Sequence, residues 1–163
     1  MARMTSGREA TVTLPTDEQI LITREFAAPR HLVYRAWTTP ELIRQWWSGR
    51  RGTVTVAEID LRVGGAWRYA MQAEGGFEVA FHGEFREIVP DERIVCTEVY
   101  EAMPDGEPAL ITATFTEADG RTTLDLLTEL PSREVRDLVL GSGMEAGVQE
   151  QMELLEELAR SLA

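Results

Sequence analysis

Apolar and polar residues alternate along most of the chain after residue 52, which is the period of a strand with one buried face. Six segments show this alternation, namely residues 53–62, 66–73, 77–89, 93–101, 109–117 and 121–130. The connections between them contain glycine, proline and aspartate, which supply the backbone angles that tight hairpins require. The pattern therefore predicts a meander of six antiparallel strands.

The chain before residue 52 has two different patterns. Residues 18–26 are rich in β-branched side chains, which favours a strand. Pro29 and Pro40 each stand where the first turn of a helix accepts proline. Apolar side chains follow both prolines at helical spacing, namely Leu32, Val33, Ala36 and Trp37 after the first and Leu42, Ile43, Trp46 and Trp47 after the second. We therefore expect a first strand followed by two short helices.

The last thirty or so residues have a helical pattern that begins at Ser132, a residue type that caps helices well. Apolar residues recur at intervals of three or four, namely Met144, Val148, Met152, Leu155, Ala159 and Leu162. Gly141, Gly143 and Gly147 would each weaken such a helix by up to about 1 kcal/mol. They indicate a close approach of the sheet or of a ligand, or else a kink.

These elements predict an α+β fold in which a curved antiparallel sheet of about seven strands wraps around a long C-terminal helix. A chain of 163 residues can bury one good core, so we expect a single domain over residues 18–163. Residues 1–17 are expected to form a flexible leader.

Two neighbouring strands carry aromatic rows. Phe77, Val79, Phe81, Gly83 and Phe85 share one strand face, and Trp67, Tyr69 and Met71 share a face of the strand before it. Gly83 leaves a gap in its row, which indicates a bend, a close approach of another group, or space for a ligand. Ordinary core packing also explains such rows, so periodicity alone leaves the choice between core and cavity open.

The charged residues of the chain exclude several kinds of binding partner and several kinds of catalysis. Its net charge of −12 arises almost entirely from residues 91–163, and such a field repels phosphate backbones and anionic lipids. We therefore expect neither nucleic acid nor a membrane surface as a partner. The chain contains no lysine, which excludes Schiff-base chemistry, a pyridoxal phosphate anchor and a P-loop lysine.

The cysteine content and the absence of long apolar stretches bear on location. Cys96 is the only cysteine, which excludes an intrachain disulfide and a zinc site with several cysteines, and favours a reducing compartment. No stretch has the length and apolarity of a signal peptide or of a membrane span. We expect a cytoplasmic protein.

Few residues could carry catalysis or hold a metal. The two histidines, His31 and His82, stand far apart in the predicted fold, so we expect neither a metal site nor a cofactor. His82 should face water, opposite the aromatic row; if its strand were turned over, His82 and Glu84 could act as an acid and a base. Three further acids stand on predicted strands, namely Glu98, Asp125 and Glu129. A buried one would have a raised pKa, and the sequence leaves open which it is.

Five segments in order carry a family resemblance. They are WTTPELIRQWW, EIDLRVGGAWRY, FHGEFREIVPDERIVCTEVYE, GRTTLDL and PSREVRDLVLGSGMEAGVQEQMELLEEL. Over residues 18–162 the chain resembles the AHSA1-like branch (activator of Hsp90 ATPase homologue) of the START/Bet v 1-like SRPBCC superfamily. The resemblance implies a helix-grip fold with a deep, mostly hydrophobic cavity between the sheet and the C-terminal helix.

The resemblance implies several functions, because fold does not fix function. Members of the superfamily bind lipids, polyketides, plant hormones or drugs, and a minority catalyse cyclisation or hydrolysis. Some bacterial relatives sequester a toxic antibiotic and so give resistance to their host. The co-chaperone after which the branch is named stimulates the Hsp90 ATPase, a role linked to the stress response.

We expect a ligand-binding protein rather than an enzyme, with a small hydrophobic molecule, lipid-like or polyketide-like, in an internal cavity. The expected lining residues are Trp37, Trp46, Trp47, Trp67, Tyr69, Phe81, Phe85, Leu138, Met144 and Val148. The alternatives are antibiotic sequestration for self-resistance, a cyclase-like or hydrolase-like enzyme, and an Hsp90-type co-chaperone or protein-interaction domain. The sequence leaves a monomer and a homodimer equally open.

Overall fold

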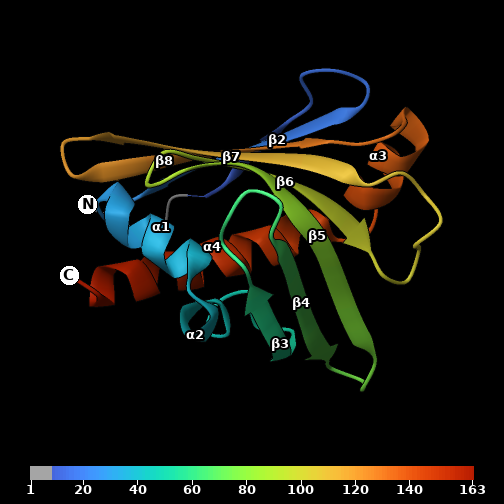
Figure 1. Cartoon of the computed structure of the whole chain (residues 1–163), viewed down its shortest axis with the longest axis horizontal. Helices are drawn as coiled ribbons and strands as arrows, with labels where there is room; N and C mark the ends of the chain where they lie inside the picture. Colours follow the sequence, from blue (N-terminus) through green and yellow to red (C-terminus); the bar gives the residue numbers. More distant parts are fainter. Residues whose placement is uncertain (1–8) are drawn as a thin grey trace.

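A strongly curved antiparallel sheet wraps the C-terminal helix in the computed structural model, which describes residues 9–163 (Figure 1). The strands are β1 (Thr11–Thr13), β2 (Gln19–Phe26), β3 (Gly52–Ile59), β4 (Ala66–Ala73), β5 (Glu78–Val89), β6 (Arg93–Tyr100), β7 (Ala109–Ala118) and β8 (Arg121–Glu129). The helices are α1 (Arg30–Thr38), α2 (Pro40–Ile43), α3 (Arg133–Leu140) and α4 (Met144–Ser161). The helix-grip fold expected from the sequence is confirmed.

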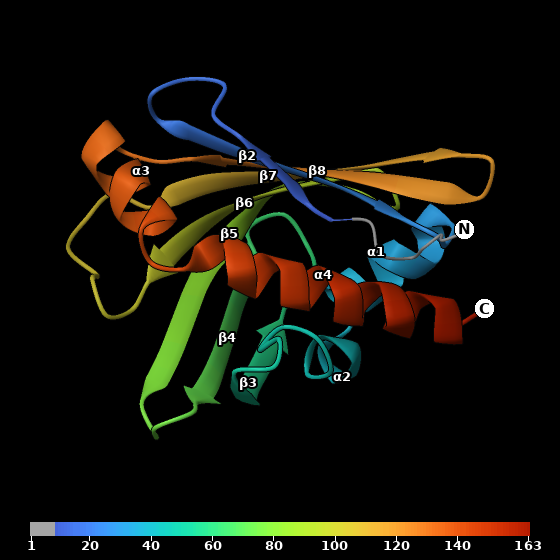
Figure 2. The ribbon, with the colours of Figure 1, turned by 180° about the vertical axis from the view of Figure 1, so that it is seen from behind.

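The strand order within the sheet is β1-β2-β8-β7-β6-β5-β4-β3. The strands from β3 to β8 pair with their neighbours in the chain, so the predicted meander is confirmed. Asp119 and Gly120 join β7 to β8 with positive φ angles of 54° and 74°, as a two-residue hairpin of type I′ requires. From behind, α4 crosses the concave side of the sheet, with α1 and α2 near one end (Figure 2).

The sheet has one strand more than the sequence predicted. Thr11–Thr13 form β1, which pairs with Leu21–Thr23 of β2 and lies within the stretch expected to be a leader. Residues 1–8 of that stretch lie outside the described residues. The Gln149 side chain binds Ala10 through two hydrogen bonds, with its oxygen 2.8 Å from the Ala10 nitrogen and its nitrogen 2.9 Å from the Ala10 oxygen. A three-residue strand is too short to show a period of two in its sequence. The groups that hold this segment, β2 and the Gln149 side chain, lie elsewhere in the chain, so the strand was not predicted.

Two helix predictions are corrected. The helix after Pro40 ends at Ile43, and Trp46 and Trp47 follow in hydrogen-bonded turns whose backbone amides donate to the Ile43 carbonyl. The predicted continuous C-terminal helix is broken between α3 and α4, because Gly143 has a left-handed φ of 83° that a right-handed helix cannot contain. Ser132 caps α3 as predicted, since its hydroxyl accepts a hydrogen bond from the Val135 amide at 3.2 Å.

A buried ion pair joins α4 to the sheet. One Glu156 oxygen lies 3.4 Å from the Arg24 guanidinium, and the other accepts a hydrogen bond from the Ala27 amide at 2.7 Å. The side chains of Arg24 and Glu156 are only 1% and 3% exposed. The guanidinium also lies 4.9 Å from the centre of the Phe26 ring. These contacts fix the C-terminal half of α4 against β2.

Gly83 on β5 allows a close approach rather than leaving space for a ligand. Trp67 of β4 lies opposite Gly83, and its indole N–H donates to the Thr97 carbonyl of β6 at 3.2 Å. A Cβ at position 83 would lie 1.8 Å from the Thr97 oxygen and 2.7 Å from the indole nitrogen. The indole therefore occupies the gap that the sequence shows at Gly83.

We expect Glu156→Gln to lower the free energy of unfolding by about 3 kcal/mol, because it leaves the Arg24 charge buried without a counter-charge. Urea unfolding at neutral pH measures the change. Glu157→Gln is the matched control, since Glu157 is exposed on the same helix and its loss should cost about 0.5 kcal/mol or less. Equal effects of the two substitutions would contradict the role of the pair.

We expect Gly83→Ala to lower the free energy of unfolding by about 2 kcal/mol or more, because the new methyl group collides with backbone that cannot move freely. Gly106→Ala should change it little, since no heavy atom lies within 4 Å of a Cβ at that position. Thermal unfolding of the two variants checks the difference, and a Gly83→Ala protein as stable as the Gly106→Ala protein would refute the steric account.

Candidate functional site

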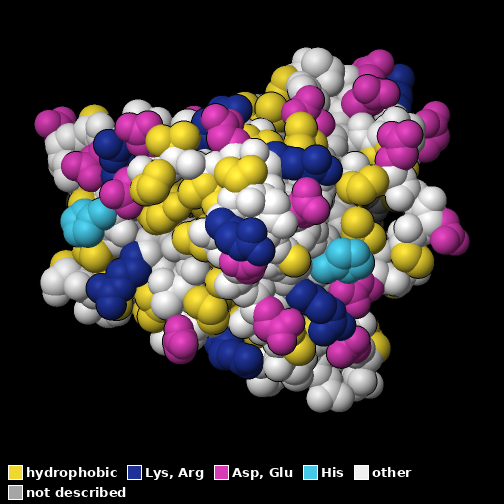
Figure 3. Space-filling model, in the orientation of Figure 1, with side chains coloured by type: hydrophobic (Ala, Val, Ile, Leu, Met, Phe, Trp, Pro, Cys, Tyr) yellow, Lys and Arg dark blue, Asp and Glu magenta, His cyan; other side chains and the backbone are white. Residues whose placement is uncertain are grey.

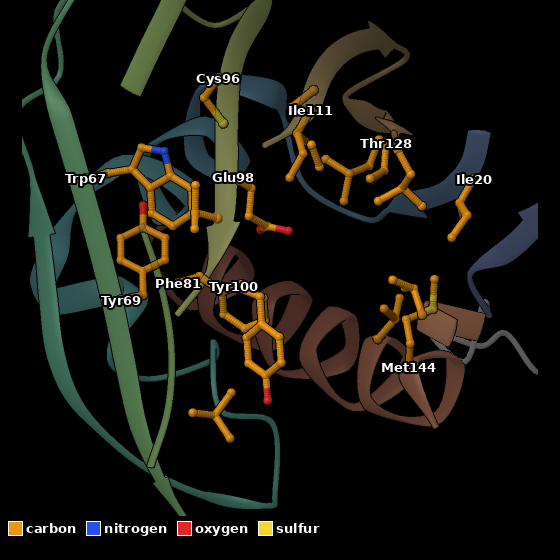
Figure 4. A pocket seen from close by; sticks show the side chains of 18 of the residues that line it. Ile20, Trp67, Tyr69, Phe81, Cys96, Glu98, Tyr100, Ile111, Thr128 and Met144 are labelled. Atoms are coloured by element: carbon orange, nitrogen blue, oxygen red, sulfur yellow. The ribbon is translucent and has the colours of Figure 1, made fainter. Parts of the chain in front are cut away.

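A cavity of about 1080 Å³ lies between the concave face of the sheet and α4 (Figure 4). Strands β2 to β8 line it together with α1, the turns after α2, α3, the first half of α4 and the connection between β6 and β7. Typical small-molecule sites enclose about 300–1,000 Å³. The cavity can therefore hold a molecule as large as a drug or a lipid.

The structure brings together on this lining all ten residues that the sequence singled out. They are Trp37, Trp46, Trp47, Trp67, Tyr69, Phe81, Phe85, Leu138, Met144 and Val148. Trp46 contributes little accessible surface, because it is 4% exposed, stacks on Trp37 at 5.1 Å and donates to the Ala36 carbonyl. That these residues bind a ligand remains a prediction.

One wall of the cavity is aromatic. Trp67 and Tyr69 lie 4.8 Å apart, Phe81 and Tyr100 stack at 5.0 Å, and Trp47 contacts Tyr69 edge-on. The predicted row on β5 is shorter than expected, because the strand begins at Glu78 and Phe77 stands outside the cavity, 62% exposed. The remaining rings hold one another in place and present a rigid apolar surface.

The residues of the opposite wall were not predicted from the sequence. This wall is mostly aliphatic, with one hydroxyl group from Thr128 of β8, and its apolar members are Ile20 and Ile22 of β2, Ile111 of β7 and Leu126 of β8. Apolar and polar residues alternate in these strands, but a closely packed core gives the same alternation, so the pattern could not identify a cavity wall. Tyr100, Met103 and Leu138 line the cavity and yet are well exposed, at 40%, 62% and 64%, which locates its mouth between the β6–β7 connection and α3.

Of the three strand acids left open by the sequence, Glu98 faces the cavity. Its carboxyl group points between the aromatic wall and Ile111 and Thr128 (Figure 4). No described residue donates a hydrogen bond to it or forms an ion pair with it, and burial raises its pKa to about 7. Asp125 instead accepts a hydrogen bond from the Thr23 hydroxyl, and Glu129 one from the Gln19 amide.

Two other titratable groups on the lining stay protonated at neutral pH. Burial raises the pKa of the Cys96 thiol to about 12 and raises the pKa of the Tyr69 hydroxyl above its usual range. A thiol with so high a pKa is a poor nucleophile, because the thiolate is the reactive form. The described cavity therefore offers one group that titrates near neutral pH, Glu98, without an activated nucleophile beside it.

His82 faces outward, so the hypothesis that His82 and Glu84 act together inside the cavity is wrong. The His82 ring nitrogen lies 2.9 Å from a Glu101 oxygen, and Arg68 binds the same carboxylate through two nitrogens at 2.9 and 3.0 Å. These partners lower the pKa of Glu101 to about 2. His31 is exposed on α1.

The described surface is charged and mixed. Acidic and basic side chains are interspersed over the face in Figure 3. Within residues 9–163, no three His, Cys, Asp or Glu side chains gather as a metal ion would require. No helix in the same range is long and apolar enough to cross a membrane.

Solved structures from several bacteria share this fold. A protein from Rhodobacter sphaeroides superimposes with a TM-score of 0.86 at 24% identity, over 94% of this chain and 99% of its own. Protein Ms6760 from Mycobacterium smegmatis gives 0.82 at 26% identity, over 91% and 96%. Protein CV1439 from Chromobacterium violaceum gives 0.73 at 27% identity, over 86% and 96%.

Sequence comparisons give the family. The human protein "Activator of 90 kDa heat shock protein ATPase homolog 1" is 30% identical over 120 residues, which is 74% of this chain and 31% of the human protein. This chain thus spans less than a third of that relative. The profile described as "Activator of Hsp90 ATPase homolog 1-like protein" matches residues 27–160. The chain therefore belongs to the AHSA1-like family within the SRPBCC fold, as its resemblance implied.

Proposed function

We propose that this protein binds a small hydrophobic molecule in the cavity between the sheet and α4. The observation that carries the proposal is the cavity itself, about 1080 Å³ with mostly aromatic and aliphatic walls. Protein interiors are normally packed as densely as organic crystals, with few voids larger than a water molecule. A space of this size and lining suits an apolar guest.

The walls supply affinity and the mouth supplies access. The rings of Trp67, Tyr69 and Phe81 offer flat apolar surface that a guest covers without distortion of the sheet. Tyr100, Met103 and Leu138 continue this surface to the outside, so an apolar molecule meets apolar contacts along its way in.

The cost of Glu98 also supports a binding role. An acid without a hydrogen-bond donor in apolar surroundings destabilises the folded state when it ionises. No described residue forms a hydrogen bond or an ion pair with this carboxyl group. Residues that lower the stability of the fold and form no stabilising contact in return are typical of functional sites.

The alternative functions have weaker support from the structure. Antibiotic sequestration is a narrower form of the same binding. Catalysis by a cyclase-like or hydrolase-like route would use Glu98 as an acid or base with a pKa of about 7, a suitable value, but it needs a second reactive group. A co-chaperone role is the second candidate, because the human relative is named as an activator of a heat shock protein ATPase. The single cysteine, Cys96, keeps the cytoplasm as the proposed location.

Ligand binding is tested by thermal unfolding against fatty acids, sterols, flavonoids and aromatic polyketides. A ligand at 100 times its dissociation constant adds about 2.7 kcal/mol, which raises Tm by several degrees in a chain of this size. We expect one chemical class to give a shift that depends on concentration. Phe81→Ala should remove it, since Phe81 lines the cavity.

Phe77→Ala is the control for this experiment, because Phe77 is a nearby phenylalanine that stands outside the cavity. It should keep the full shift. Far-UV circular dichroism verifies that both variants fold. If no class raises Tm, or if the two variants lose the shift equally, the cavity is not the binding site, and the protein-interaction function is favoured.

We expect Glu98→Gln to make the protein more stable at pH 8 by up to about 3 kcal/mol, and to change stability little at pH 5. The pKa of Glu98 is about 7 when folded, against 4.5 ordinarily. As pH rises between these values, the unfolded chain releases a proton that the folded chain retains. The free energy of unfolding therefore falls by about 1.4 kcal/mol per pH unit across this window.

Urea titrations of both proteins at pH 5, 6, 7 and 8 measure the effect. The difference between variant and wild type cancels the contributions of all other acids. A difference that stays constant over this range would contradict the raised pKa.

A further inference from the structure

We propose that the ligand of this cavity is a lipophilic cation, an apolar molecule that carries a protonated amine, and that Glu98 binds the amine. The inference rests on the proposed function and names the chemical class of its ligand. It is carried by the distribution of charge on the lining and by the position of Glu98 within it.

The lining is acidic without a basic counterpart. Its ionisable carboxyl groups belong to Glu98, Asp105 and Glu107, and none of its described residues is an arginine or a histidine. The chain has 16 arginines and two histidines, and none of them is among the described lining residues. A ligand carboxylate would meet like charge and find no cation to pair with.

Glu98 occupies the inner part of this acidic lining. Its carboxyl group lies between the aromatic wall and the aliphatic wall, and no described side chain or backbone amide donates to it (Figure 4). A buried carboxylate is stabilised by a cation with hydrogen atoms to donate, and charge-assisted bonds of this type are about twice as strong as neutral ones. An ammonium group supplies both the charge and the donors.

The surroundings of Glu98 also suit a cation. The rings of Trp67, Tyr69, Phe81 and Tyr100 line the same cavity, and aromatic rings attract ammonium groups. Asp105 and Glu107 stand at the mouth, in the β6–β7 connection, where their negative field raises the local concentration of cations. Entry of the ligand through the mouth and binding beside Glu98 therefore both favour a positively charged ligand.

The other titratable groups on the lining do not oppose this selection. Burial keeps Tyr69 and Cys96 protonated at neutral pH, and the carboxyl groups of Asp105 and Glu107 have the same sign of charge as Glu98. The described lining from β2, β3, β7, β8, α1, α3 and α4 contributes no ionisable side chain. Binding of an amine should therefore strengthen between pH 6 and pH 8, as Glu98 ionises, whereas binding of a neutral molecule should not.

The test compares three probes with the same twelve-carbon chain, namely dodecylamine, dodecanol and dodecanoic acid. Dissociation constants come from quenching of tryptophan fluorescence at pH 7.5, below the micelle concentration of each probe. We expect the amine to bind about tenfold or more tightly than the alcohol, and the acid to bind more weakly than the alcohol. Lowering the pH to 6 should weaken only the binding of the amine.

Two variants assign the effect to one residue. Glu98→Gln should reduce the preference for the amine over the alcohol by about tenfold, because it removes the carboxylate that pairs with the ammonium group. Glu84→Gln removes the same charge from the outer face of the sheet, where the residue is exposed and does not line the cavity, and should retain the full preference.

The outcomes separate the two proposals. If the alcohol or the acid binds wild type as tightly as the amine, the protein binds hydrophobic molecules but the inferred cation is wrong. If Glu98→Gln keeps the preference for the amine, Glu98 is not the group that selects it. If none of the three probes binds, this inference fails, and the panel of fatty acids, sterols, flavonoids and aromatic polyketides decides separately whether the cavity binds a hydrophobic molecule.

Discussion

The carboxylate of Glu156 binds the Arg24 guanidinium and the Ala27 amide in the interior, and this contact determines where α4 lies against the sheet. Because each charge would be costly to bury alone, the pair holds together only in one register of helix and strand. It fixes the C-terminal half of α4, where Leu155 and Ala159 are completely buried. The first half of the helix, beyond the pair, lines the cavity instead.

The break before α4 complements this anchor. With Gly143 in a left-handed conformation, α3 does not continue along the axis of α4. It lies at the mouth of the cavity, where Leu138 and Val139 join the lining. One continuous helix could not both pack along the sheet as α4 does and border the mouth of the cavity as α3 does. The fold thus separates a closely packed end, held by an ion pair, from an open end bordered by α3.

Glu98 shows what the cavity costs the protein. A leucine at this position of β6 would satisfy the apolar surroundings, and the carboxyl group instead lowers stability once it ionises. The cavity itself also forgoes packing contacts that a filled core would gain. Both costs fall on the same region, the space between the aromatic wall and α4. Stability elsewhere, from the long antiparallel ladders and the core around Phe26 and Phe115, allows the fold to tolerate them.

The sequence by itself determined the meander and the starts of the two short helices, because periods of 2 and 3.6 and turn residues act locally. The cavity and the ten residues expected to line it came from the family resemblance, since periodicity left the choice between core packing and a cavity open. The sequence could not reveal β1, the left-handed Gly143 or the role of Gly83, since these depend on Gln149, on the turn into α4 and on the Trp67 indole. It also left Glu98, Asp125 and Glu129 equivalent. Only the tertiary structure decided which of them is desolvated, because desolvation depends on atoms from strands and helices far apart in the chain.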